Sequence, residues 1–177
     1  MQIHNNILVR VDKDDLDANG KFSVPEDAKE IGCTAFMFCN KDLKDIDIPE
    51  GIQGIEPFVF YECENLESIS LPKSMREVGE LAFFNCYKLR GVEFPEGVKR
   101  IGNGVFTNCM VLDTIIIPES VEKIGTDLFY GCDSLKRIAL PSKFKNEIED
   151  ILGPDVTVKN DLEILFIETQ KPAEKGE

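Results

Sequence analysis

The sequence predicts an α/β solenoid, that is, one domain built from stacked copies of a short unit. Three observations lead to this fold class. Six prolines recur at intervals of 24, 23, 23, 23 and 23 residues, and each of the first five is followed by phenylalanine after 11 residues and by cysteine after 14. A fixed period of this length is typical of repeat proteins, in which a unit buries its apolar residues only against its neighbours. The prolines are Pro25, Pro49, Pro72, Pro95, Pro118 and Pro141.

Several columns of residues keep their register through all the units. The phenylalanine column is Phe36, Phe60, Phe83, Phe106 and Phe129, and the cysteine column is Cys39, Cys63, Cys86, Cys109 and Cys132. Glycine stands seven residues after proline at Gly32, Gly79, Gly102 and Gly125, and Glu56 is the exception. A leucine follows each cysteine, and in the first unit it comes one residue late, at Leu43, which explains the single 24-residue interval. Other columns keep only apolar character, so the pattern predicts one continuous core.

Each unit combines a strand and a turn. The stretch from Leu66 to Leu71 alternates apolar and polar residues, which predicts a short strand with one buried side. Pro72 ends this strand, because proline cannot donate a hydrogen bond to a sheet. The segment from Glu80 to Cys86 predicts a short helical or 3-10 turn whose alanine and phenylalanine point inward. The preceding glycine supplies backbone freedom at the corner.

These residues carry a family resemblance. The unit Leu-x-x-Ile-x-Leu-Pro-x-x-Val-x-x-Ile-Gly-x-x-Ala-Phe-x-x-Cys is clearest in residues 66–86 and 112–132. It resembles the BspA-like (Treponema pallidum type) leucine-rich repeats, and the resemblance extends over residues 22–141. It implies a right-handed leucine-rich-repeat horseshoe with short parallel strands on the concave face and the turns on the convex side. It also implies a binding protein, since many members lie on the surfaces of bacteria and protists that live in animal hosts.

The remaining segments predict caps on a single structural domain. Residues 1–22 are expected to form an N-terminal hairpin, with Ile7–Val11 facing Lys21–Val24, and residues 23–141 hold five repeats of 23–24 residues. Residues 142–168 are expected to form a C-terminal cap. In this cap Ser142 starts a helix over Lys143–Leu152, and two short strands follow at Val156–Lys159 and Leu162–Glu168. The polar tail at 169–177 is expected to be disordered.

Composition excludes several classes of function. The 20 Lys and Arg against 33 Asp and Glu give a net charge of −13, which argues against binding to nucleic acid or to anionic lipid. The single histidine, His4, excludes a site with several histidine ligands. The chain shows no signal peptide and no apolar run long enough for a membrane helix. We therefore expect a soluble monomer, either cytoplasmic or exported by a route without a visible leader.

Two local patterns suggest metal or redox chemistry, and both have a simpler interpretation. Asp15, Asp17, Asn19 and Glu26 have the spacing of a calcium loop, but strand-like flanks and Pro25 favour an acidic hairpin turn. The cysteines lack the close pairs of a zinc site, so we expect reduced thiols that pack inward as small apolar residues. No acid, base and nucleophile converge in the pattern. We therefore expect no cofactor, no catalytic residue and no enzymatic activity.

The outward positions of the predicted strands are the best candidates for function. They form the concave face, and we expect them to bind a protein partner, whose identity the sequence does not give. Ile116 stands out because it is apolar where polar residues are expected, and it lies in register with neighbours that suit a partner's anchor. The candidate residues are Asp45, Asp47, Ser68, Ser70, Glu93, Thr114, Ile116, Arg137 and Ala139. The alternatives are a structural or adaptor part of a larger assembly and a calcium-stabilised binding module.

Overall fold

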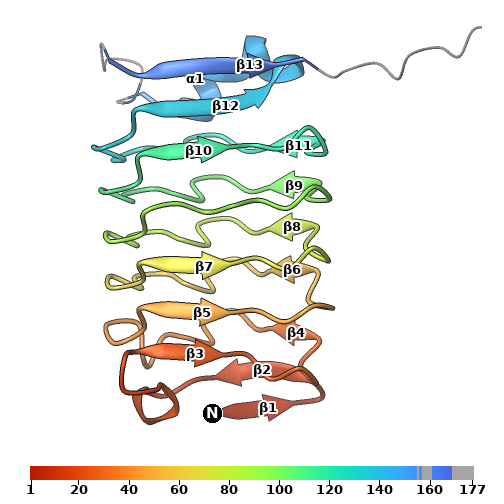
Figure 1. The fold of residues 1–177 in the computed structure, drawn as a ribbon, viewed down its shortest axis with the longest axis vertical. Coiled ribbons are helices and arrows are strands. Elements are labelled where there is room, and N and C mark those ends of the chain that lie inside the picture. Colours follow the sequence, from red (N-terminus) through yellow and green to blue (C-terminus); the bar gives the residue numbers. More distant parts are fainter. Residues whose placement is uncertain (155, 157–160, 169–177) are drawn as a thin grey trace, which may run out of the picture.

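The chain winds into a solenoid of about seven turns, stacked along the longest axis of the molecule (Figure 1). The computed structural model describes residues 1–154, 156 and 161–168. We call the stretch from one proline to the residue before the next a rung. Rungs 1 to 5 are residues 25–48, 49–71, 72–94, 95–117 and 118–140.

The longer strands form one side of the stack, which we call the long-strand face. Its strands are β3 (Lys21–Ser23), β5 (Asp45–Asp47), β7 (Ser68–Ser70), β10 (Thr114–Ile116), β12 (Arg137–Pro141) and β13 (Glu163–Ile167). Asp45 lies beside Ser68 and Thr114 beside Arg137, in parallel register. This confirms the predicted parallel strands and the alignment of their outward columns.

A second set of short strands, which the sequence analysis does not predict, forms the short-strand face. They are β4 (Glu30–Ile31), β6 (Gly54–Ile55), β8 (Glu77–Val78), β9 (Arg100–Ile101) and β11 (Lys123–Ile124). In the sequence, the glycine column comes directly after these short strands. A Cβ atom on Gly79 would lie 2.5 Å from the backbone nitrogen of Pro57 on the preceding rung. Glycine is therefore needed here for close packing of neighbouring rungs, more than for a turn.

The segments between the short-strand face and the next long strand form the turn face, at residues 33–43, 57–66, 80–89, 103–112 and 126–135. The expected 3-10-type hydrogen bonds are present, as from Cys86 N to Phe83 O at 3.1 Å. No helix forms, because residues such as Leu81 (φ 51°) and Asn85 (φ 60°) adopt left-handed backbone conformations. With these left-handed residues in the turn, Phe83 N donates to Val105 O of the next rung at 3.0 Å. Backbone hydrogen bonds therefore join the stacked turns as a third ladder.

The predicted core columns are confirmed. All five column phenylalanines have no exposed surface, and the five column cysteines are at most 1% exposed. Consecutive phenylalanine rings stack with centroids 5.0 to 5.8 Å apart. Stacked rings bury large apolar areas and also gain the favourable geometry of offset aromatic pairs. The ring column is therefore a continuous central element of the solenoid.

The N-terminal cap is a hairpin, but its strands are not the predicted pair. β1 (Gln2–His4) pairs antiparallel with β2 (Ile7–Arg10), and β2 continues in parallel to β4. Asn5 and Asn6 form the two-residue connection with φ angles of 52° and 63°, which asparagine tolerates well. The predicted pairing of Ile7–Val11 with Lys21–Val24 is wrong, because β3 pairs with β5 on the long-strand face. A 3-10 helix, η1 (Lys13–Asp15), lies between β2 and β3.

The C-terminal cap buries an apolar stripe against the last rung. It consists of η2 (Ser142–Glu147) and α1 (Ile148–Leu152), and Phe144, Ile151 and Leu152 are buried. The expected single helix is thus split, and no side-chain hydrogen bond caps its start. β13 confirms the second predicted strand, whereas the first, apart from Val156, and the tail at 169–177 lie outside the described residues. No helix in the described part of the chain is long and apolar enough to cross a membrane.

Candidate functional site on the long-strand face

Two outward columns run along the long-strand face, and their chemistry changes from one end to the other. Asp45, Ser68, Gly91, Thr114 and Arg137 form one column, and Asp47, Ser70, Glu93, Ile116 and Ala139 form the other. Both begin acidic at rung 1, and the second becomes apolar at rung 4. A partner in contact with this face therefore meets different surfaces at its two ends.

The acidic end is organised by one lysine. Lys21 Nζ lies 2.8 Å from Asp47 Oδ2 and 3.5 Å from Asp45 Oδ2. The hydrogen bond with Asp47 is the main reason why the pKa of Lys21 is raised. Ser68 Oγ donates to Asp45 Oδ1 at 2.9 Å. Two carboxylates against one ammonium group leave this end with a net negative charge.

A groove crosses the middle of the face. The ladder is interrupted between β7 and β10, where residues 91–93 form no strand and only an isolated bridge joins Glu93 to Ile116. The groove has a volume of about 920 Å³ and is lined by five of the nine predicted residues, Ser68, Ser70, Glu93, Thr114 and Ile116. Ile116 is 57% exposed, the largest value among the exposed large apolar side chains of the described residues.

At the C-terminal end, Arg137 is exposed as predicted, whereas Ala139 is not. Arg137 Nε donates to Glu163 Oε2 at 2.7 Å, so its guanidinium is held by a neighbouring strand. Ala139 is only 7% exposed, which contradicts its assignment as open surface. It lies in register between Ile116 and Leu165, whose larger side chains flank its methyl group. Leu165, 43% exposed, extends the apolar column and was missed because the register of the last strand was not assigned.

The acidic turn is held by hydrogen bonds of its own. Asp15 accepts a hydrogen bond from Asp12 N at 2.8 Å and pairs with the N-terminal ammonium group. Asp17 Oδ1 accepts from Asn19 N and Lys21 N at 2.8 and 2.9 Å, and these bonds lower the pKa of Asp17. Within the described ranges, no three His, Cys, Asp or Glu side chains are placed to hold a metal ion. The geometry is that of a hydrogen-bonded turn, but it is not the predicted hairpin turn, because β2 and β3 do not pair with each other.

The buried thiols are poorly suited to nucleophilic chemistry. All six cysteines are free, and only Cys33 is exposed. Burial raises the pKa of Cys39 to about 12 and raises the pKa values of Cys63, Cys86 and Cys109 well above 9.0. A thiol must ionise to attack, so these groups are inert at neutral pH.

The repeat pattern and the fold match one family of proteins. The model of the BspA type leucine-rich repeat region matches residues 20–151 in six copies, which is most of the chain. The chain belongs to the BspA-type leucine-rich repeat family. The family model finds six copies, one more than the five units that the proline spacing predicts. No curated protein matches the chain in sequence.

Solved structures of other leucine-rich repeat proteins share this architecture. A leucine-rich repeat protein of T. pallidum is 26% identical, with a TM-score of 0.69 over 85% of this chain and 71% of that one. One from Bacteroides ovatus is 26% identical, with a TM-score of 0.66 over 83% of this chain and 42% of that one. A leucine-rich cell surface protein of Faecalibacterium prausnitzii is 25% identical, with a TM-score of 0.59 over 86% and 48% of the two chains. The chain thus spans less than half the length of the last two.

Proposed function

We propose that this chain is a non-enzymatic binding module that holds a protein partner on its long-strand face. The observation that carries the proposal is the groove between β7 and β10, with Ile116 57% exposed beside it. An exposed β-branched side chain next to a groove suits a partner's apolar anchor. The carboxylates of Asp45 and Asp47 at the other end favour a basic group on the same partner.

The family adds support for a binding role. Leucine-rich repeat solenoids present an extended surface, and such surfaces suit recognition. The F. prausnitzii relative is described as a cell surface protein, and we extend a surface or host-contact role to this chain as part of the proposal. We further propose that the module acts as a monomer, which a solution mass near 19.9 kDa would support.

A peptide-display selection against the whole chain tests the proposal. The expected result is a set of peptides whose affinity for Ile116→Asp is at least about tenfold weaker, since a buried carboxylate opposite an apolar anchor is costly. Val111→Asp is the matched control, because Val111 is 41% exposed on the turn face of the same rung. Its peptide affinities should stay within about twofold.

Both variants should melt at the wild-type temperature, because neither side chain is buried. Arg137→Ala should also weaken binding, because it removes the guanidinium group from the C-terminal end of the face and leaves the Glu163 carboxylate without that partner beside the apolar column. If the selected peptides bind Ile116→Asp as well as the wild type, the groove is not the binding site.

A further inference from the structure

The solenoid is interrupted between rungs 1 and 2, away from the long-strand face. β4 and β6 belong to different sheets, although every later pair of neighbouring short strands is hydrogen-bonded. On the turn face, Phe58 N donates to Glu80 O at 3.1 Å and Phe60 N to Ala82 O at 3.0 Å, which joins rungs 2 and 3. No backbone hydrogen bond joins residues 33–38 to residues 56–60 in the described structure.

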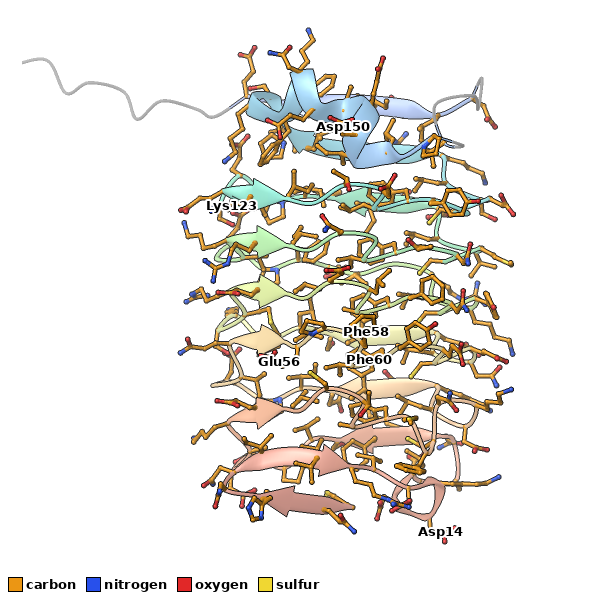
Figure 2. All side chains as sticks on the ribbon, turned by 180° about the vertical axis from the view of Figure 1, so that it is seen from behind. Asp14, Glu56, Phe58, Phe60, Lys123 and Asp150 are labelled. Carbon is orange, nitrogen blue, oxygen red and sulfur yellow. The ribbon has the colours of Figure 1, made fainter. Side chains whose placement is uncertain are left out.

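Glu56 accounts for the interruption. It occupies the glycine column, in which a Cβ atom on Gly79 or Gly102 would approach the preceding rung to 2.5 Å. A side chain at this place prevents the close backbone approach that joins the later short strands, although the Phe36 and Phe60 rings still stack with centroids 5.0 Å apart. The ring column records the change, since Phe36 and Phe60 are inclined by 28° whereas Phe60 and Phe83 are inclined by 1°. Figure 2 shows Glu56, Phe58 and Phe60, which all belong to rung 2.

An apolar cleft opens on the turn face where the backbone hydrogen bonds between these two rungs are missing. It has a volume of about 460 Å³, and its walls include Met37 of rung 1 and Phe58, Tyr61 and Glu62 of rung 2. Phe84 of rung 3 stacks on one face of the Tyr61 ring, with centroids 4.8 Å apart and planes 7° apart. The other face of Tyr61 is therefore directed toward rung 1 and the cleft. Phe58 meets Tyr61 edge-on at 5.9 Å and 61°, so the two rings form a corner.

Phe58 occupies a costly backbone position. Its φ angle is 62°, and the corresponding position is left-handed in every other rung as well, at Thr34, Leu81, Gly104 and Asp127. A bulky aromatic residue is unfavourable in this conformation, whereas glycine is not. Burial of the ring in the core does not offset this unfavourable conformation, because the ring is 39% exposed. The left-handed backbone thus belongs to the repeat, and rung 2 differs in placing an exposed aromatic ring at this position.

The charge around the cleft favours a cation. Glu62 takes part in none of the ion pairs found among the described residues, and the whole chain carries a net charge of −13. Aromatic ring faces also attract cations. The same surface already shows this contact, since the guanidinium of Arg10 lies 3.8 Å from the ring centroid of Phe38. Phe38 directly follows Met37, which lines the cleft.

We propose that this cleft binds the guanidinium group of an arginine side chain on a partner protein. The planar group stacks on the open face of Tyr61 and pairs with the carboxylate of Glu62, while Met37 and Phe58 cover the aliphatic part of the side chain. Arginine suits this arrangement better than lysine, because its flat guanidinium combines stacking with paired hydrogen bonds. The site is separate from the long-strand face, so it does not depend on the function proposed above.

An NMR titration of the whole chain tests the proposal with the peptide acetyl-Gly-Ser-Arg-Ser-Gly-amide. The expected result is saturable shifts of the Phe58 and Tyr61 ring signals. The same peptide with neutral citrulline in place of arginine should bind at least about fivefold more weakly. Tyr61→Ala and Glu62→Gln should each weaken binding of the arginine peptide about fivefold. Tyr130→Ala is the matched control, since Tyr130 has the same place in rung 5 and is 42% exposed, and it should leave binding unchanged.

Phe58→Gly separates binding from folding. Glycine adopts the left-handed conformation without strain, so this variant should keep the wild-type melting temperature and still bind the arginine peptide about fivefold more weakly. Equal binding of the citrulline and arginine peptides would overturn the proposal. So would unchanged binding by Phe58→Gly and Glu62→Gln, or an equal loss in Tyr130→Ala.

Discussion

The backbone ladders of this solenoid are interrupted twice, on different faces, and the two interruptions have opposite causes. Between rungs 1 and 2, Glu56 places a side chain in a column where the packing leaves room only for glycine. On the long-strand face, Gly91 lacks a side chain at a place where one would fit, since a Cβ atom there would have only Thr114 O nearby, at 4.0 Å.

The comparison shows that one residue type has opposite effects in neighbouring columns. Glycine stabilises the short-strand face because rungs approach closely there, and it weakens the long-strand face because a strand gains from a β-branched side chain. A groove or cleft opens at each interruption, and the repeat core continues past both. The two proposed binding surfaces thus lie where a column departs from its rule.

The largest expected effect comes from adding a side chain inside the regular stack. Gly102→Ala would place a Cβ atom 2.5 Å from the backbone nitrogen of Glu80, and we expect it to lower the free energy of unfolding by on the order of 3 kcal/mol. Glu56→Ala, at the same column position, should change it by less than about 0.5 kcal/mol, because a Cβ atom is already accommodated there and β4 and β6 are not hydrogen-bonded. Urea denaturation measures both. Equal losses would contradict the role given to Glu56.

The next effect concerns the cysteine column, which continues through the first interruption. The buried thiols keep their protons in the folded state, with a pKa of about 12 for Cys39, while unfolded cysteine ionises near 9.0. Their stabilising contribution is complete below pH 9 and is lost as the pH rises toward 12, by up to about 1.4 kcal/mol per thiol and pH unit.

Urea denaturation at pH 8 and pH 10 checks this dependence. Cys39→Ala and Cys86→Ala should each reduce the loss of stability between the two pH values, and by similar amounts. A reduction in Cys86→Ala alone would mean that the column is broken at the first interruption, as the other ladders are.

A smaller, stabilising effect is expected at the second interruption. Gly91→Thr supplies a β-branched side chain at a strand position with open space, and it should raise the free energy of unfolding by about 0.5–1 kcal/mol. Thermal melting measures the change. A loss of stability would show that the gap in the long-strand ladder has a cause other than Gly91.

The last prediction concerns the local protection of backbone amides and not the global free energy of unfolding. Phe83 N donates to Val105 O at 3.0 Å, whereas Phe36 N has no hydrogen bond among the described residues. Native-state hydrogen exchange should therefore be faster at the Phe36 amide than at the Phe83 amide, although both rings are fully buried. Equal protection would mean that rungs 1 and 2 pair in solution.

The sequence predicts the parts of this fold that every rung repeats. Phe83 and Cys86 recur at a fixed offset, so their burial and the parallel stacking of the strands follow from the period. Local departures are harder to predict. Glu56 was visible as an exception, but its consequence depends on the distance between rungs, which the sequence does not contain.

The candidate sites were predicted only in part, for the same reason. The groove contains five of the nine predicted residues, yet Ala139 is covered because its neighbours in register are larger. Tyr61 stands next to the buried Phe60 in sequence, and only the left-handed turn backbone places it outside the core. The hairpin partner of β2 was misassigned because the strand at residues 2–4 was overlooked.

Chemical labelling of the cysteine column can report how many rungs of the solenoid are open. One thiol, Cys33, is exposed, and each rung buries one more in the cysteine column. A brief pulse of an alkylating reagent should therefore add one adduct to the intact chain and one further adduct for each rung that has opened. The mass spectrum of such a sample would show whether the solenoid unravels turn by turn from an end or opens all at once.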